Sequence, residues 1–368
     1  MKQARMNRIR AAVLAGVMVF FGAVCGRSAD SVVRPLVGPE VLKAGKLEVV
    51  WKSDVPMRDG EKLERLFLLG NNLYAMSDRN YIVCLNREKG HVVFSKQFTE
   101  PGFPILGPDL YNGKLFSIVS NNLVELDTES GKEKGVMRLG HGVACPAARN
   151  SEFYYIAGVD KRLRVLRAKD KVKLFEVSAE NESAISTIIA NEKVAIFGTE
   201  AGNVICIAAD AARKIWEFKA DGGIIRPMIW DGNSIYFASK DTCVYKIGAE
   251  KGNLIWKHQA GGILDGAPRV TEEFLYQSVV NKGLSAIDKN SGTVLWQIRA
   301  GTDLLAEWEN RTYAVTKTGM LVMMDNKKGK RLNSACLPGV KKYAPNMDGS
   351  KIYLGDEKGK IECLKPVK

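Results

Sequence analysis

An internal repeat of about 40 residues limits the folds open to this chain more than any other feature of its sequence. The steps between successive repeats are 41, 40, 41, 40, 40, 37 and 40 residues for one aligned column: Cys84, Glu125, Val165, Cys206, Lys246, Ala286, Met323 and Cys363. The next column contains only sizeable apolar residues: Leu85, Leu126, Leu166, Ile207, Ile247, Ile287, Met324 and Leu364. Self-similarity at such a period is typical of solenoids and propellers.

Each repeat unit predicts four short strands. In the clearest unit these strands fall within Pro227–Trp230, Asp231–Ser239, Thr242–Ile247 and Asn253–Trp256, and Gly, Asn and Asp turn signals separate them. Four strands in about 40 residues make the blade of a β-propeller. Because such repeats bury their faces on their neighbours, they grow as one body. We therefore predict one all-β domain, an eight-bladed propeller of four-stranded antiparallel blades.

Most units end in an aromatic residue, which we assign to the outermost strand of its blade. The aromatic residues are Phe94, Phe175, Trp216, Trp256 and Trp296. The second and seventh units lack one, and their nearest matches are the Met137 region and Leu332. The eighth unit stops at Leu364, and Trp51 in the segment 47–51 supplies its missing aromatic residue. We therefore predict that this N-terminal strand completes the C-terminal blade, which removes the free sheet edges.

The first 26 residues resemble an export signal. Four basic residues precede an apolar run at 11–24: Lys2, Arg5, Arg8 and Arg10. This run of 14 residues is shorter than the roughly 20 that span a membrane. Cys25 follows it, at the place where a bacterial lipoprotein carries its lipidated cysteine; the alternative is ordinary cleavage near Gly26 or Ala29. We expect a signal peptide at 1–26, a linker at 27–44 and the propeller at 45–368.

The chain is basic, with a formal net charge of +13 that falls to +9 without residues 1–26. Residues 321–368 hold ten Lys and one Arg against five acidic residues, a net charge of +6. Such a region attracts acidic protein surfaces, anionic lipid or nucleic acid, and export makes nucleic acid the least favoured partner. We expect one basic sector that binds a partner through Lys327, Lys328, Lys341 and Lys342. The alternative is that these lysines only solvate turns.

The central channel is the other candidate binding region, because propellers bind ligands and partners where their innermost strands begin. Arg226, Asp265, Asp303 and His141 lie in such segments, and we expect them to converge. We assign a partner-binding role to Arg226 and Asp265. The alternative is a set of ion pairs between blades.

Six cysteines follow Cys25, and an even number in an exported protein raises the question of disulfides. Three of them, Cys84, Cys206 and Cys363, occupy one repeat column. This position favours buried thiols. A disulfide among these residues or among Cys145, Cys243 and Cys336 is the alternative.

The segment Leu284–Trp296 carries a motif of Ile-Asp, a turn glycine and a tryptophan that resembles the PQQ-like repeat of quinoprotein-type propellers. The resemblance covers about residues 45–366. It weakens at Lys171 and Ala212, which replace the glycine, and at three residues that replace the aspartate: Arg167, Ala208 and Gly248. In size and layout the chain is similar to BamB-like outer-membrane assembly lipoproteins. This similarity implies a non-catalytic scaffold of the periplasm or outer membrane, with protein partners in a β-barrel assembly complex.

The same resemblance raises the question of a quinone enzyme. Quinoprotein dehydrogenases hold pyrroloquinoline quinone between a tryptophan and a vicinal disulfide, beside a calcium ion. This chain has no adjacent cysteines, and four of its six tryptophans belong to the repeat. Of the other two, Trp230 is expected in the core, which leaves Trp308. We therefore predict no catalytic residue and no cofactor; an oxidoreductase and an envelope-polymer or carbohydrate binder remain the alternative functions.

A metal site is not expected either. The three histidines, His91, His141 and His258, fall in different repeat units without ligand spacing, whereas a metal site normally needs three or four converging ligands.

Overall fold

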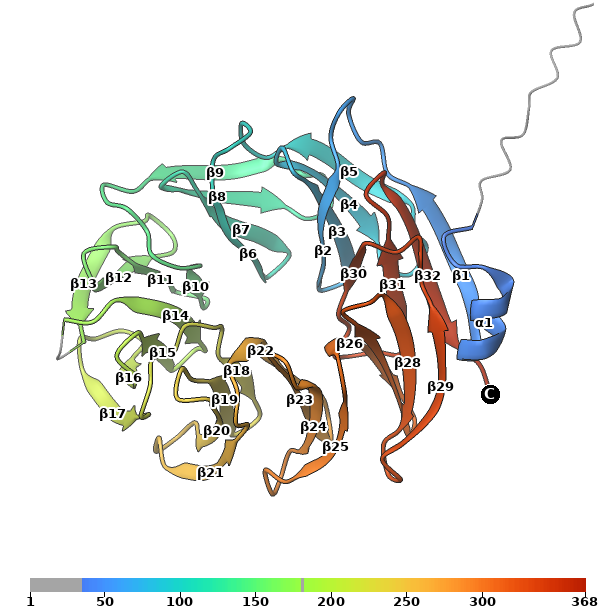
Figure 1. Ribbon diagram of the computed structural model, residues 1–368. Coiled ribbons are helices and arrows are strands. Elements are labelled where there is room, and N and C mark those ends of the chain that lie inside the picture. Colours follow the sequence, from blue (N-terminus) through green and yellow to red (C-terminus); the bar gives the residue numbers. More distant parts are fainter. Residues whose placement is uncertain (1–34, 180–181) are drawn as a thin grey trace, which may run out of the picture. The chain divides into compact units, whose positions relative to one another are not determined.

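The computed structural model describes residues 35–179 and 182–368. The expected signal peptide and Cys25 lie outside the described residues. Within the compact unit Leu36–Lys368, the strands form eight four-stranded sheets whose neighbouring strands are antiparallel. Figure 1 shows these sheets arranged around a ring as the blades of a propeller. The predicted fold class is therefore confirmed.

The blades follow one another along the chain. The first three contain β2 (Leu63–Leu69), β3 (Asn72–Ser77), β4 (Tyr81–Asn86), β5 (Val92–Gln97); β6 (Ile105–Tyr111), β7 (Lys114–Val119), β8 (Asn122–Asp127), β9 (Glu133–Arg138); β10 (Ala148–Arg149), β11 (Phe153–Ala157), β12 (Arg162–Arg167) and β13 (Lys173–Ser178). The next three contain β14 (Ile185–Ala190), β15 (Val194–Thr199), β16 (Asn203–Ala208), β17 (Lys214–Lys219); β18 (Ile229–Asp231), β19 (Ser234–Ala238), β20 (Cys243–Gly248), β21 (Leu254–Gln259); β22 (Leu264–Val270), β23 (Phe274–Val279), β24 (Gly283–Asp288) and β25 (Val294–Ile298). The seventh and eighth contain β26 (Gly301–Trp308), β27 (Arg311–Thr316), β28 (Met320–Asp325), β29 (Lys330–Cys336); β30 (Lys342–Ala344), β31 (Ile352–Gly355), β32 (Lys360–Pro366) and β1 (Leu47–Asp54).

The repeat column lies on the third strand of each blade, opposite the aromatic residue of the fourth strand. The observed pairs are Cys84 with Phe94, Val165 with Phe175, Cys206 with Trp216, Lys246 with Trp256, Ala286 with Trp296 and Cys363 with Trp51. In the second and seventh blades, Gly135 and Asn333 occupy the place of the aromatic residue. Our assignment of Met137 and Leu332 to this column is therefore wrong.

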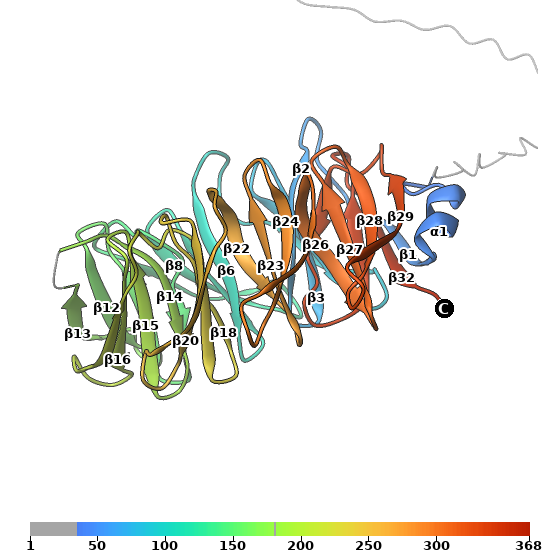
Figure 2. The same cartoon turned by 60° about the horizontal axis from the view of Figure 1, so that its bottom comes forward.

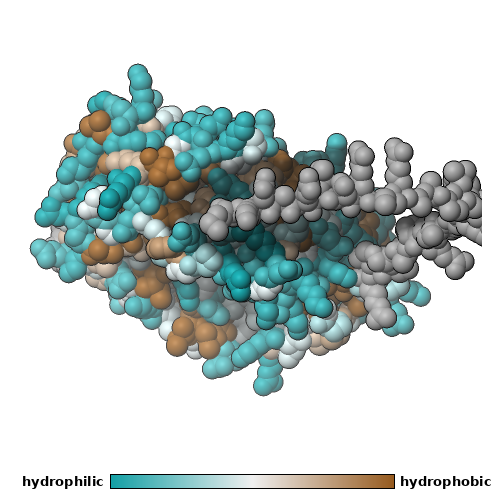
Figure 3. Space-filling view, turned by 90° about the horizontal axis from the view of Figure 1, so that it is seen from above, coloured by the Kyte–Doolittle hydropathy of each residue, from teal (hydrophilic) through white to brown (hydrophobic). Residues whose placement is uncertain are grey.

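A recurrent β-bulge explains the misassigned leucine. In the seventh blade the register shifts between Met323 and Met324, so that Leu332 has no partner across the ladder. All eight blades shift at the equivalent place, and six of them leave an exposed aliphatic residue there: Val50, Leu174, Ile215, Ile255, Leu295 and Leu332. The bulge thus turns the residue before each aromatic toward solvent. Figure 3 shows apolar residues scattered among hydrophilic ones on the face seen from above.

In most blades, a glycine in the turn before the fourth strand packs against the aromatic residue of the preceding blade. Gly252 has a φ of +67°, and a Cβ added to it would lie 2.4 Å from the ring of Trp216. Both its conformation and the lack of space therefore require glycine. The same contact joins Gly90 to Trp51, Gly131 to Phe94 and Gly292 to Trp256.

The tryptophans are also held by hydrogen bonds to the neighbouring turn. Each of three indole N–H groups donates to a carbonyl oxygen at 3.1 Å: Trp51 to Arg87, Trp216 to Ala249 and Trp256 to Lys289. The aspartate of the motif shapes that turn, since Asp288 accepts backbone N–H bonds from Asn290 and Ser291. The aspartate and glycine of one repeat thus form the surface on which the previous repeat's tryptophan packs.

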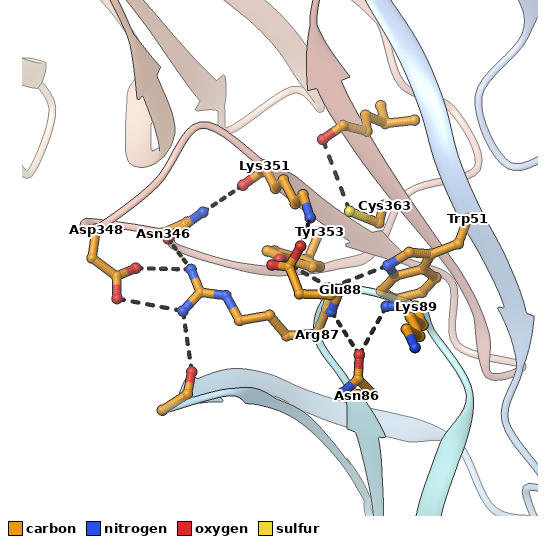
Figure 4. Close-up of polar contacts among 12 residues, drawn as sticks. Trp51, Asn86, Arg87, Glu88, Lys89, Asn346, Asp348, Lys351, Tyr353 and Cys363 are labelled. Atoms are coloured by element: carbon orange, nitrogen blue, oxygen red, sulfur yellow. Dashed lines mark hydrogen bonds and ion pairs between the residues drawn. The ribbon is translucent and has the colours of Figure 1, made fainter.

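The ring closes with the same contact. β1 pairs with β32, which places the N-terminal strand in the C-terminal blade as predicted. Figure 4 shows Trp51 beside the turn of the first blade, where Arg87 extends back to the last blade. The Arg87 guanidinium donates to Asp348 at 2.8 Å and to Asn346 at 2.9 Å, and Lys351 forms an ion pair with Glu88. Polar and apolar contacts thus both join the ends of the chain.

One short helix, α1 (Pro39–Gly45), lies in the segment expected as a linker. It has proline at its first position, which suits a helix start, and it ends at Lys46 with a φ of 49°. Asn333, in the place of the seventh aromatic residue, donates a hydrogen bond to the carbonyl of Ala44 at 2.5 Å. Figure 2 shows α1 beside the outer strand β29. In the eighth blade the fourth strand, β1, follows α1 in the chain, so α1 lies where the other blades have the turn before their fourth strand.

The closing contact predicts a large stability effect at Trp51. We expect Trp51→Ala to lower the free energy of unfolding by about 3–5 kcal/mol, because it removes a buried indole from the core. Val50→Ala, at the exposed bulge position next to it, should change stability by less than about 0.5 kcal/mol. Deleting residues 45–51 should destabilise the whole ring. Denaturant unfolding measures all three, and equal midpoints for the parent and Trp51→Ala would rule out closure through this residue.

Candidate partner-binding surface

The strand order determines which residues share a face of the ring. One face, here called the connection face, carries the segments that lead from the fourth strand of one blade to the first strand of the next. It also carries the start of each innermost strand, including the segments that hold Arg226, Asp265 and Asp303. The opposite face carries the turns between first and second strands and between third and fourth strands.

Arg226 and Asp265 meet across the junction of the fifth and sixth blades. Their charged atoms lie 3.7 Å apart, and their side chains are 44% and 65% exposed. An exposed pair at this distance contributes at most about 1 kcal/mol to stability. Breaking this pair therefore costs little free energy, and both side chains can form ion pairs with a binding partner instead.

Asp303 is instead part of a tighter pair with Arg269. The Arg269 guanidinium donates two hydrogen bonds of 2.9 Å to the Asp303 carboxylate, across the junction of the sixth and seventh blades. Planar bidentate pairs of this kind are strong and specific in geometry. Asp303 is thus already paired within the propeller. Arg269, its partner, is a channel residue that sequence reasoning missed, because no motif or repeat column marks it.

His141 does not join these residues. It lies in the third blade beside Gly158, and burial, together with the positive charge of Arg164, lowers its pKa. Of the four residues expected to converge, Arg226 and Asp265 therefore meet, whereas Asp303 pairs with Arg269 and His141 lies beside Gly158. Residues in successive blades form separate pairs because each innermost strand faces mainly its immediate neighbours.

Three exposed apolar residues lie on the connection face in the segments that hold Arg226 and Asp265 or next to them. Ile225 precedes Arg226, Ile263 lies two residues before Asp265, and the backbone N–H of Val280 donates to the Ile263 carbonyl at 2.8 Å. Their exposures are 40% for Ile225, 70% for Ile263 and 41% for Val280. We call these five residues the apolar–ionic patch. Their sequence gave only a weak signal, because aliphatic residues after a glycine pair also occur in buried strands.

The four candidate lysines lie on different faces. Lys327 and Lys328 lie in the turn between β28 and β29, on the opposite face, whereas Lys341 and Lys342 lie at the start of β30, on the connection face. Lys327 lines a cavity of about 790 Å³ whose acidic residues are Glu272, Glu273, Glu307, Glu309 and Asp348. Lys342 is 3.3 Å from the carboxylate of Glu64. The expected single basic sector does not form, because β29 separates the two pairs by its full length.

A buried ionic cluster replaces the aromatic–glycine contact between the second and third blades. Glu125 lies opposite Gly135 and is 5% exposed. Its carboxylate accepts hydrogen bonds from Lys171 at 2.5 Å and from the Tyr154 hydroxyl, and lies 3.6 Å from Arg149. Burial alone would raise the pKa of Glu125, but the bonds from Lys171 and Tyr154 hold it below its ordinary value. Lys171, which replaces the turn glycine with a φ of 62°, thus has a structural role.

The cysteines carry no reactive thiol pair within the described residues. Cys84, Cys206 and Cys363 are buried thiols, as are Cys145 and Cys243, while Cys336 is exposed. Burial raises the pKa of Cys206 to about 12, so this thiol stays protonated and unreactive at neutral pH.

Two further features of the described residues bear on function. They contain no group of three or more His, Cys, Asp or Glu side chains arranged to hold a metal ion. None of their helices is long and apolar enough to cross a membrane.

Comparison with known proteins supports the repeat assignment. A family model described as outer membrane protein assembly factor BamB matches residues 156–265, 200–339 and 244–367. These overlapping matches span more than half of the chain. No curated protein sequence matches significantly.

Solved structures share the fold at low sequence identity. BamB from Moraxella catarrhalis is 12% identical and aligns with a TM-score of 0.64, covering 87% of this chain and 99% of that one. The computationally designed Ika8 protein is also 12% identical and aligns with a TM-score of 0.63, covering 83% of this chain and 96% of that one. Because a designed protein matches as well as a natural one, these likenesses establish the propeller fold only.

The buried ionic cluster predicts a specific loss of stability in acid. A carboxyl whose pKa is lowered by folding stabilises the protein above its ordinary pKa, here 4.5, and loses that contribution as the pH falls through its lower folded value. At neutral pH, Glu125→Gln should cost about 3 kcal/mol, because it removes the carboxylate that two partly buried cations, Arg149 and Lys171, share. This difference from the parent should shrink as the pH falls below 4.5.

Urea unfolding at about pH 7 and about pH 3 measures the effect. Glu129→Gln, an exposed glutamate in a turn of the same blade, is the matched control and should be neutral. A cost for Glu125→Gln that is the same at both pH values would contradict the ionic origin.

Proposed function

Because the chain belongs to the PQQ-like repeat family whose model is described as outer membrane protein assembly factor BamB, we propose that it is an exported, non-catalytic scaffold of the bacterial cell envelope. In this proposal it works in the periplasm, with Cys25 as a lipid anchor to the outer membrane. Its partner is a protein subunit of a β-barrel assembly complex.

The apolar–ionic patch is the observation that carries this proposal. Exposed aliphatic side chains next to charged groups are typical of protein-binding surfaces. Ile263, the most exposed residue of the patch, is 70% exposed, and leaving its side chain in water does not stabilise the free protein. The loosely paired Arg226 and Asp265 offer one charge of each sign to a partner, which sets orientation and specificity.

Enzyme chemistry has less support from the residues present. The sequence lacks adjacent cysteines for the vicinal disulfide of quinoprotein dehydrogenases. The charged residues of the channel pair with each other across blade junctions, and such pairs hold the blades together without any reaction.

Co-purification tests the proposal. The tagged protein, isolated from envelope membranes, should bring with it the barrel subunit of a β-barrel assembly complex, identified by mass spectrometry. Ile263→Asp should reduce this capture about tenfold or more, because a central interface residue contributes about 2 kcal/mol. Lys327→Gln with Lys328→Gln, on the opposite face, is the matched control and should leave capture unchanged.

Salt dependence separates the roles of the connection-face lysines. Replacing Lys341 and Lys342 with glutamine should weaken capture at low salt and have little effect at high salt, because surface charges act mainly on association and are screened. Failure to capture any barrel subunit would refute the proposed role. Unchanged capture by Ile263→Asp would refute the patch as the binding surface.

A further inference from the structure

A cavity of about 430 Å³ lies between the fourth and fifth blades. It opens on the opposite face, away from the apolar–ionic patch. Its apolar wall is formed by the indoles of Trp216 and Trp230 with Ile215 and Val194. Trp230, which the sequence placed in the core, is half-buried at the edge of this cavity. The volume is within the range of small-molecule sites, roughly 300–1,000 Å³.

The cavity exists because one turn residue is small. At the second position of the turn before the fourth strand, Arg87 and Lys289 extend into the equivalent junctions and bond to Asp348 and Asp231 of the preceding blades. The fifth blade has Ala249 at this position, and its methyl group leaves the junction unfilled.

Other junctions with alanine at the same position are filled from elsewhere. Beside Ala168, the ammonium group of Lys171 donates to the alanine carbonyl at 2.8 Å. Beside Ala209, the hydroxyl of Tyr155 donates to the alanine carbonyl at 3.2 Å, and Asn150 donates to that hydroxyl. At Ala249 the carbonyl receives only the indole N–H of Trp216, which belongs to the repeat itself.

Trp230 presents a free aromatic face to this cavity. Its indole N–H donates to the carbonyl of Gly232 at 2.9 Å, which holds the ring in place from its own turn. Within the described part of the chain, no aromatic ring or cation stacks on it. The Trp230 indole therefore offers an ordered apolar surface, while its N–H group keeps its hydrogen bond.

The rim of the cavity is polar and carries both signs of charge. Lys193, Asn233 and Glu250 line it, and all three are exposed. Their side chains form no hydrogen bond or ion pair with other described residues. A wholly apolar ligand would desolvate these groups without pairing them, and an ion would meet a like charge on one side. A neutral ligand with one apolar face and several hydroxyls can pack on the Trp230 indole and hydrogen-bond to the polar rim residues.

We propose that this cavity binds a neutral saccharide. A pyranose ring would place its C–H face on Trp230, and its hydroxyls would exchange hydrogen bonds with Asn233, Glu250 and Lys193. The site is independent of the proposed scaffold role, because the apolar–ionic patch lies on the connection face. Loss of one activity therefore need not affect the other.

Trisaccharide binding tests the proposal. Maltotriose, cellotriose and chitotriose should each be titrated against the full mature protein, with saturation-transfer NMR and tryptophan fluorescence as readouts. At least one should bind with a Kd of about 1 mM or tighter. Trp230→Ala should weaken its binding at least tenfold, and so should Ala249→Lys, which introduces the side chain that fills the next junction. Trp308→Ala, a half-buried tryptophan on the same face in the seventh blade, is the matched control and should leave binding unchanged.

Three results would overturn the proposal. The first is that none of the three sugars binds at a concentration of about 10 mM, ten times the expected Kd. The second is that Trp308→Ala weakens binding as much as Trp230→Ala. The third is that an apolar peptide binds at Trp230 while no trisaccharide does, which would assign the cavity to a protein partner. Circular dichroism of each variant shows whether the ring remains folded, and Ala249→Lys tests the cavity without removing any aromatic residue.

Discussion

The packing of an aromatic residue from one blade on the turn glycine of the next is the contact on which the ring depends. A blade cannot bury both of its faces alone, so its stability comes from its neighbours. The glycine leaves room for the aromatic side chain. A backbone carbonyl of the same turn accepts the indole N–H of Trp51, Trp216 or Trp256. Together these two features fix the distance and the rotation between blades. Because this contact recurs once in most blades, the sequence repeats at about 40 residues.

Three junctions depart from this contact and still keep the propeller closed; at one of them Ala212 replaces the turn glycine. Between the second and third blades, the Glu125 cluster holds the place of the aromatic ring with charges. At the seventh blade, Asn333 bonds to α1 instead of stacking on a turn. Junctions between blades therefore accept side chains of different chemistry, provided that these side chains fill the space between the blades. Beside Ala249 the space is not filled, and a cavity results. The binding site that we propose thus lies where the sequence departs from the repeat.

The sequence predicts the architecture well because the signals are periodic. Spacing, turn residues and the missing eighth aromatic residue were enough to infer eight blades and closure through Trp51. Features that depend on a single residue or on a neighbouring blade were not predictable. The bulge shifts the aromatic column from Leu332 to Asn333, and α1 is too short to show helical periodicity. For the candidate site, the sequence identified Arg226 and Asp265 but not Arg269, because the partner of an inner-strand residue lies one blade away. Sequence reasoning assigned the four candidate lysines to their blades, but it did not predict on which face of the propeller each pair lies.

A double-mutant cycle between Trp216 and Gly252 measures the central contact most directly. Gly252→Ala in the parent places a Cβ against the indole and also strains a φ of +67°. In the Trp216→Ala background only the backbone strain should remain, because the added methyl group then has space. We therefore predict that Gly252→Ala costs at least about 1 kcal/mol less in that background than in the parent, measured by denaturant unfolding. Costs that agree within about 0.5 kcal/mol in the two backgrounds would contradict the claim that this contact joins the blades.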